Sequence, residues 1–380
     1  MNFKEKLRQL ARCAVEIDGN KIDDFYPFLT SVNIETSRKD AAICKLKFIS
    51  VRDGSGEWNI QDAAPALFSP WRHIRIDAVF GAHSAEIMRG YIRDVHLDYP
   101  DDMSASVTVT GQDESILLDR KHVQKSYSTF EQQLDDDALV RELLKPHWVG
   151  SQVKIAGSGK TCGNLYFDGT PIRLIRDRAA LNGYEFFIRE GKAYFGPPAL
   201  AGEPQPTILI YAGKASNCLR FSARHDGHLP DSVHFVDVPE SCEEVEAGES
   251  YTNDSQPMGT TAADSTTQGL EEFDWRIQMP RGSTQMEREA RAKAKAEESS
   301  WKIKATGELD GSAYGHVLQP NRTVNVDGVG STYGGLWYVD EVQHSFSSDG
   351  YRQAFKLIRN ATGEVGLSSK LDALAQVRLR

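Results

Sequence analysis

Residues 72–80 read RHIRIDAVF, and this stretch decides the class of fold. Apolar side chains occupy every second position, at Ile74, Ile76, Ala78 and Phe80. Successive side chains of a β-strand point to opposite faces of its sheet, so a period of two predicts a strand with one buried face.

The same period returns in residues 91–99 (YIRDVHLDY) and 104–111 (SASVTVTG), with a turn between them at Pro100-Asp101-Asp102. Nearer the N-terminus, residues 31–36 and 42–50 predict a hairpin around residues 37–40. Several strands joined by tight turns are typical of an antiparallel sandwich or barrel. We therefore expect a first sheet domain over residues 13–122, behind a short amphipathic helix at residues 1–12.

The character of the chain changes over residues 123–212. A stripe of apolar residues in 134–145 predicts a helix, which Pro146 ends. A second helix is predicted from its signals: Thr170 as N-cap, Pro171 in the first turn and Gly183 after the last turn. A hairpin follows in residues 184–195, so this part reads as a small α+β module.

Strands return in the last part of the chain, at residues 218–224, 232–238, 323–327, 336–346 and 351–359. They are interrupted between Pro239 and Trp275, where ten acidic residues and no Lys or Arg predict a solvated linker. Thr284-x-x-Glu287 then forms a capping box, which predicts a helix over residues 284–302.

The expected fold class is thus α+β and mainly antiparallel β, with two sheet domains around an α+β module. We place the second sheet domain at residues 213–238 and 300–362. The acidic linker and its helix cover 239–299, and a C-terminal segment at 363–380 could form a short helix.

Composition narrows the classes of function. The formal net charge of −10 argues against a nucleic-acid binder, which needs a basic surface to displace counterions. No signal peptide or membrane-spanning run is present, so we expect folding in the cytoplasm and no direct membrane insertion. The cysteines are scattered and have no CxxC spacing, which predicts isolated reduced thiols at Cys13, Cys44, Cys162, Cys218 and Cys242.

Sequence motifs that would indicate a phosphate-binding, metal-binding or catalytic site are weak. Residues 157–161 (GSGKT) end like a phosphate-binding loop, but Lys154 stands where that loop needs glycine, and an extended segment follows. Residues 225–228 (HDGH) read as a glycine turn with exposed histidines, and no metal-ligand spacing occurs. The acidic groups at 101–102, 135–137 and 243–244 fall in turns, at a helix start or in the linker. We therefore assign no catalytic, cofactor-binding or metal-binding residue.

Three stretches resemble the phage late control gene D proteins, the baseplate hub family related to the N-terminal part of VgrG spike proteins. The first runs from residues 87–95 (IMRGYIRDV) to Leu118, and the second is 171–195 (PIRLIRDRAALNGYEFFIREGKAYF). The third is 315–361, with the patterns Leu318-x-Pro320-x-x-x-Val324, Gly335-x-Trp337-Tyr338-Val339-x-x-Val342-x-His344 and Tyr351-x-x-x-Phe355-x-x-x-Arg359. The resemblance covers about residues 10–362.

The resemblance implies two barrels like the subunit of a tail tube, so that a homotrimer presents six of them. Such a hub joins a sixfold tail tube to a trimeric spike within the baseplate of a phage tail or injection machine, with no enzymatic activity. The spike would be a separate polypeptide, because few residues follow Arg359. DNA or cargo would only pass through the channel, past a wall that we expect to be acidic. The sequence does not single out the residues that contact other subunits, tube or spike.

Two other classes stay open at this point. One is a tail-associated hydrolase of the cell wall, which would clear peptidoglycan in a zymogram. The other is a carbohydrate-binding module or adhesin, which would expose aromatic side chains along one face of a barrel and bind to a glycan array.

Overall fold

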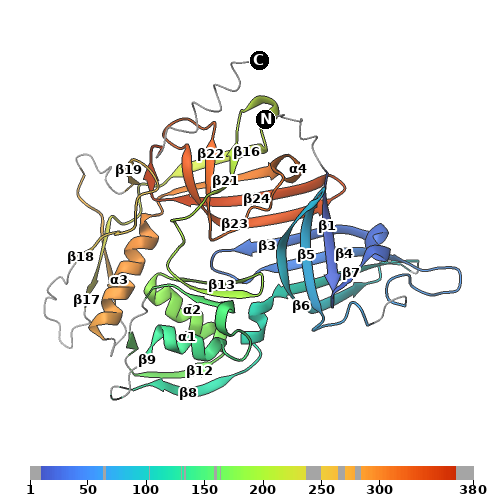
Figure 1. Cartoon of the computed structure of the whole chain (residues 1–380), viewed down its shortest axis with the longest axis horizontal. Coiled ribbons are helices and arrows are strands. Elements are labelled where there is room, and N and C mark those ends of the chain that lie inside the picture. Colours follow the sequence, from blue (N-terminus) through green and yellow to red (C-terminus); the bar gives the residue numbers. More distant parts are fainter. Residues whose placement is uncertain are drawn as a thin grey trace.

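The computed structural model describes residues 10–364, apart from residues 63–65, 102, 130, 132–133, 158–160, 163, 237–249, 264–269 and 279–283. A long antiparallel sheet dominates it (Figure 1), with the small α+β module below and helix α3 at the side. The sheet contains 13 strands, and two of these, β15 and β22, branch from its main path. The expected class, α+β and mainly antiparallel β, is confirmed.

The N-terminal half of this sheet has the strand order β3-β4-β7-β6-β5-β1-β2. Its strands are β1 (Ala11–Ile17), β2 (Asn20–Lys21), β3 (Leu29–Ser37), β4 (Ile43–Val51), β5 (His73–Phe80), β6 (His83–Asp98) and β7 (Ser104–Asp113). The expected hairpin around residues 37–40 is confirmed, because β3 and β4 pair antiparallel. The carboxylate of Asp101 accepts hydrogen bonds from the backbone N–H groups of Met103 and Ser104, which stabilises the turn from β6 to β7.

The C-terminal half repeats the order as β16-β21-β24-β23-β22-β15. Its strands are β15 (Gln205–Leu209), β16 (Cys218–His225), β21 (Ile303–Asp310), β22 (Thr323–Asp327), β23 (Gly335–Ser347) and β24 (Gly350–Arg359). Helix α4 (Gly311–Tyr314) follows β21. The two halves are hydrogen-bonded to each other, because the C-terminal part of β23 pairs antiparallel with β3.

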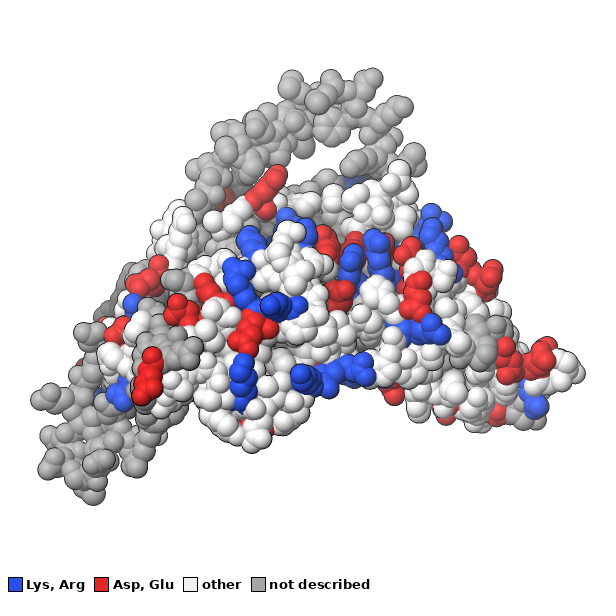
Figure 2. Space-filling model, turned by 60° about the horizontal axis from the view of Figure 1, so that its bottom comes forward, with Lys and Arg blue, Asp and Glu red and all other residues white. Residues whose placement is uncertain are grey.

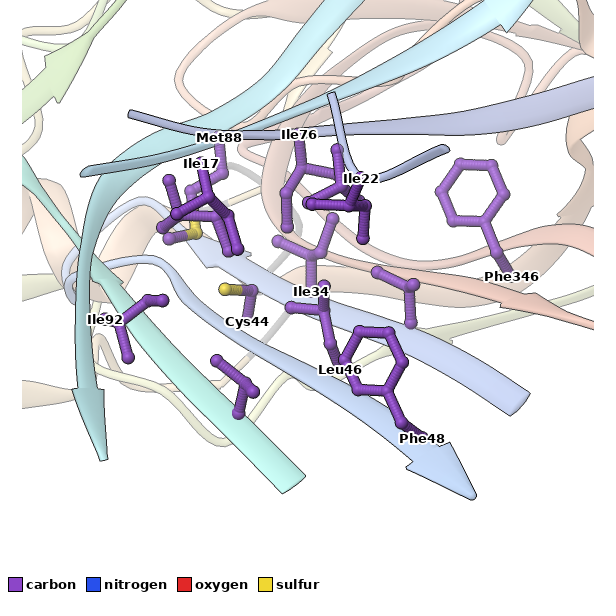
Figure 3. Packing of buried hydrophobic residues seen from close by; sticks show 14 of the residues in the cluster. Ile17, Ile22, Ile34, Cys44, Leu46, Phe48, Ile76, Met88, Ile92 and Phe346 are labelled. Atoms are coloured by element: carbon purple, nitrogen blue, oxygen red, sulfur yellow. The ribbon is translucent and has the colours of Figure 1, made fainter. Parts of the chain in front are cut away.

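Each half encloses its own apolar core. In the N-terminal half the inward residues of neighbouring strands meet, among them Ile34, Leu46, Ile76 and Ile92 (Figure 3). Phe346 of β23 reaches this core across the junction of the halves. The second core lies around Trp337, Phe355 and Leu357. The burial of these alternate apolar side chains therefore stabilises the fold of each half.

The α+β module packs two helices, α1 (Asp136–Leu144) and α2 (Pro171–Asn182), against short strands. Helix α2 begins and ends where its signals predict, with Gly183 in the left-handed conformation at φ 68°. The hydroxyl of Thr170 makes no capping hydrogen bond, although Thr170 is the N-cap. The strands are β8 (Val123–Ser128), β9 (Leu134–Asp135), β10 (Val153–Ile155), β11 (Thr161–Cys162), β12 (Leu165–Gly169), β13 (Glu185–Arg189) and β14 (Lys192–Gly196).

Helix α3 (Gln285–Ser300) starts at the predicted capping box, where the Thr284 hydroxyl accepts from the backbone N–H of Glu287. It packs against a separate sheet of β17 (Ser232–Val236), β18 (Ser250–Tyr251) and β20 (Asp274–Gln278). Strand β17 was expected in the second sheet domain, and this was wrong. Its Phe235 packs with Tyr251 and with Ala292 of α3, so this apolar face is buried outside the long sheet.

Two further expectations need correction. The helix expected at residues 1–12 is wrong for Ala11 and Arg12, which begin β1 and pair with β5; residues 1–9 lie outside the described residues. The acidic linker was expected to be too polar to bury, yet Tyr251, Met258 and Ala263 within it are buried. There β19 (Thr261–Ala262) pairs with β25 (Ala361–Thr362), so this part of the linker is docked. The C-terminal segment lies outside the described residues from residue 365 on.

Candidate assembly interface

One face of the long sheet is solvent-exposed across both halves. Eight strands share it, in the order β16-β21-β24-β23-β3-β4-β7-β6, and every ladder between them is antiparallel. The buried residues of these strands alternate with exposed or half-buried ones, as in β4 and β21. We call the surface formed by the exposed residues of these eight strands the sheet face.

Charges of both signs are mixed on the sheet face. Ion pairs connect neighbouring strands, with Arg220 3.1 Å from Glu308, Arg352 3.4 Å from Asp310 and Lys356 2.7 Å from Glu341. Many of the other side chains are small and polar, such as Ser106, Thr108 and Ser345. One side of the whole molecule likewise has Lys, Arg, Asp and Glu interspersed, without a large region of one sign (Figure 2).

The first end of the sheet face is strand β16. Among the described residues it pairs only with β21, so its other edge has no strand partner. The side chains of Arg220 and Arg224 are 74% and 81% exposed there, and Leu219 is 55% exposed. An open strand edge carries unpaired N–H and C=O groups and is a template for pairing with another chain.

The other end is the C-terminal part of β6. This strand pairs with β5 only up to Tyr91, and Ile92 exchanges two backbone hydrogen bonds with residues 71–72. Beyond a bulge between Ile92 and Asp94, β6 pairs with β7 alone within the described part of the chain. Asp94, His96 and Asp98 are exposed along this second open edge.

The junction inside the chain shows how such an edge is used. One edge of strand β23 changes its partner in the same way. It pairs with β22 up to Tyr338 and, after a bulge between Val339 and Glu341, with β3. Strand β6 therefore occupies the place in the N-terminal half that β23 occupies in the C-terminal half. By the same order β16 corresponds to β3, the strand that β23 pairs with.

A buried polar network fixes the module to the sheet. The guanidinium of Arg38, at the turn after β3, lies 3.2 Å from the carboxylate of Glu185 and 3.1 Å from that of Asp340. Glu185 also accepts hydrogen bonds from Asn321 and from the Tyr338 hydroxyl. Burial raises the pKa of Glu185, against the opposing effect of Arg38, Asn321 and Tyr338. The network thus couples both sheet halves to β13.

The described residues that the sequence singled out do not gather at one site, although Thr161 of β11 pairs with Asp135 of β9. Thr161 and Cys162 of the loop-like GSGKT region form strand β11, so no helix follows it, as expected; residues 158–160 lie outside the described residues. His228 is exposed and stacks on Phe273, whereas His225 is half-buried at the end of β16. Cys13, Cys44 and Cys218 are free thiols, and burial raises the pKa of Cys44 to about 12.

Asp101 and Asp136 have local structural partners, whereas residues 102, 243 and 244 lie outside the described residues. Asp136, at the start of α1, is fully buried and forms an ion pair with Arg178 of α2. Among the described residues, no group of three His, Cys, Asp or Glu side chains gathers as metal ligands do. No described helix has the length and apolar composition that crossing a bilayer requires.

The two open edges were missed by the sequence interpretation. Only a weak signal could have found them: a charge pattern, with Arg220 and Arg224 spaced by four on one strand, and Asp94 and Asp98 spaced by four on another. Which strands lack a partner depends on the pairing of the whole sheet.

Solved structures of phage tail proteins have the same fold. A 43 kDa tail protein of prophage MuSo2 from Shewanella oneidensis superposes with a TM-score of 0.66 at 13% identity, over 93% of this chain and 99% of that one. A tail protein from Neisseria meningitidis gives 0.63 at 13% identity, over 92% and 97%. An Escherichia coli component of the type VI secretion system gives 0.55 at 10% identity, over 93% and 79%.

The sequence matches none of the curated proteins. A family model described as "Alg8 N-terminal domain" matches residues 8–348, which include the N-terminal sheet half, the module, helix α3 and the C-terminal sheet half up to β23. That description names a domain and states no activity. The chain belongs to the family of the Alg8 N-terminal domain.

Proposed function

We propose that this chain is a structural hub: three copies close into a ring that joins a sixfold tail tube to a trimeric spike. The tail proteins and the secretion component with the same fold support a place in the baseplate of a phage tail or related injection machine. In this proposal each sheet half is one tube-like domain, and the protein acts by assembly and not by catalysis.

The observation that carries the proposal is the equivalence of β6 to β23. Since β23 pairs with β3 after its bulge, β6 pairs after its own bulge with β16 of the next copy. The sheet face contains eight strands in antiparallel alternation, so β6 of one copy meets β16 of the next antiparallel as well. Such a head-to-tail contact generates a ring when the rotation closes.

Three copies give six equivalent junctions, three within chains and three between them. This number matches a sixfold tube, and three copies of eight strands give a barrel of 24. With strands about 4.8 Å apart and a tilt of about 40°, the barrel is roughly 50 Å across between backbones. Barrels of that size leave an open channel, which the sheet face lines.

The register follows from the internal junction. There Gln343 faces Glu35 and Ser345 faces Asn33. Equivalent positions put His96 opposite Arg224 and Asp98 opposite Ser222 of the next copy. Asp94 and Asp98 then lie diagonally beside Arg224, within reach of a long side chain, so opposite charges meet across the edge.

The channel wall of this ring has mixed charge. Lys45 and Lys47 stand on the sheet face with Glu35 and Asp94, and the three ion pairs described above neutralise further charges. The acidic wall expected from the net charge of −10 therefore does not fit the sheet face. Interspersed charges and small polar residues offer no strong attraction to passing DNA or cargo.

A charge swap tests the contact. Native mass spectrometry is applied to the wild type, to Arg220→Glu/Arg224→Glu, to Asp94→Lys/Asp98→Lys and to the combination of all four. We expect trimers for the wild type, monomers for each double variant, and trimers again for the combined variant, because opposite charges then meet once more. Lys214→Glu, in the exposed turn before β16, is the matched control and should remain trimeric. Monomers of the wild type, or failure of the combination to restore trimers, would contradict the proposal.

A further inference from the structure

A large cleft lies away from the sheet face, between α2, α3 and β20. It has a volume of about 960 Å³. The two helices meet beside it at Gly183, where an added Cβ would lie 3.3 Å from the Cα of Ala294. Gly183 and Ala294 both line the cleft, so part of the cleft lies where the two helices pack together.

One wall of the cleft is the edge of a strand. Trp275, Arg276, Ile277 and Gln278 of β20 are consecutive, and all four line the cleft. Successive side chains of a strand point to opposite faces, so consecutive residues reach one cleft only across the strand's edge. The opposite edge of β20 is paired in parallel with β17, and within the described residues β20 has no second strand partner.

Six basic and four acidic side chains line the cleft, so its charges are not balanced. Lys39 and Lys295 both form ion pairs with Glu298. These pairs lower the pKa of Glu298 to about 2, although its burial acts in the opposite direction. By contrast, Arg176, Arg276 and Arg291 form no ion pair with any described residue. The Nε atom of Arg176 is buried without a hydrogen-bond partner in the described part of the chain.

Apolar surface accompanies these guanidinium groups. Trp275 is 47% exposed, and its ring meets that of Phe273 edge to face with centroids 6.0 Å apart. Pro198 lies among the lining residues too. A strand edge flanked by guanidinium groups and an exposed indole combines the features that recognise an extended peptide: backbone hydrogen bonds, charge and pockets for side chains.

We infer that this cleft binds an acidic, extended segment of a partner protein, which adds to β20 as a strand. The backbone of β20 supplies the hydrogen bonds, and Arg176, Arg276 and Arg291 select carboxylates, since a guanidinium binds a carboxylate with two parallel hydrogen bonds. The inference does not depend on the ring, because no residue of the two open edges of the sheet face takes part.

The test uses fluorescence anisotropy with the full chain and a fluorescein-labelled peptide of five Glu-Val repeats. Two further peptides are N-methylated, one at every Glu and the other at every Val. In an added strand only alternate N–H groups face β20, so one methylated peptide should bind at least tenfold more weakly while the other changes less than threefold. A peptide of five Lys-Val repeats should not bind. Equal loss with both methylated peptides, or no binding of the Glu-Val peptide, overturns the inference.

Variants then locate the site. Arg276→Glu/Arg291→Glu changes two exposed side chains and should weaken binding at least tenfold, while Lys214→Glu should change it less than twofold. The native mass of the Arg276→Glu/Arg291→Glu protein should equal that of the wild type, so that loss of peptide binding and loss of assembly are distinguished. Unchanged peptide affinity in this variant counts against the cleft.

Discussion

The Nη1 atom of Arg38 lies 3.2 Å from Oε1 of Glu185, and the two side chains are only 10% and 2% exposed. Arg38 follows β3, the strand at the junction of the halves, and Glu185 begins β13 of the module. A charge buried in this way needs its partner, since its desolvation is not repaid otherwise.

Glu185→Ala should therefore lower the free energy of unfolding by about 3–5 kcal/mol, because it removes the buried carboxylate that pairs with Arg38 and leaves only the more exposed Asp340. Lys39→Ala is the control at the next residue, since the ion pair of Lys39 with Glu298 is about half exposed. Its cost should stay below about 1 kcal/mol. Urea unfolding of both variants measures the difference. Equal losses of unfolding free energy would show that the buried ion pair stabilises the fold no more than the exposed one.

His344 gives a prediction for pH. It is buried, its Nδ1 lies 2.8 Å from the Tyr351 hydroxyl, and burial lowers its pKa from 6.5 to about 3. The unfolded chain takes up a proton on this ring below about pH 6.5 while the folded chain does not, so stability falls as the pH drops from 6.5 towards 3. At pH 5 the loss is about 2 kcal/mol relative to neutral pH.

The comparison is with His344→Asn, which keeps a polar atom near the position of Nδ1 and does not titrate. Denaturant unfolding at pH 7.5 and pH 5 should show a smaller loss for the variant by about 2 kcal/mol. The same pH dependence in both proteins would place the titrating group elsewhere.

Gly90 permits the close approach of β6 and β7. A Cβ added there would lie 1.9 Å from the carbonyl oxygen of Gln112 and 2.6 Å from the Cα of Asp113. Gly90→Ala should cost about 1–3 kcal/mol or more, because backbone must move. Gly54→Ala, where an added Cβ meets nothing within 4 Å, should be nearly neutral by thermal unfolding. If Gly90→Ala left the thermal stability unchanged, the backbones of β6 and β7 could separate at this position at little cost.

The sequence predicts local structure well where a single residue or a short motif determines it. Glycine at 183 and the Thr284–Glu287 box mark helix ends because they satisfy backbone groups locally. Period-two alternation likewise predicts β5 and the hairpin of β3 and β4. These signals act within a few residues, so no knowledge of the rest of the chain is needed.

The candidate interface could not be predicted in this way. Gln343 pairs with Glu35 across some 300 residues of sequence, and nothing in either strand specifies that partner. The sequence likewise contains no signal for the bulge after Ile92, where β6 separates from β5. Strand β17 was misplaced for the same reason, because an alternating strand does not indicate which apolar surface will cover it.

A disulfide between copies tests the ring most directly. Asp98 and Ser222 of neighbouring copies should be directly opposite, with Cα atoms about 4.5–5.5 Å apart, which a disulfide can bridge. We predict that mild oxidation of the Asp98→Cys/Ser222→Cys protein gives a covalent species of three chains of 42.3 kDa each on a non-reducing gel, while each single variant does not. Monomers alone, or a ladder that continues beyond three chains, would contradict a closed threefold hub.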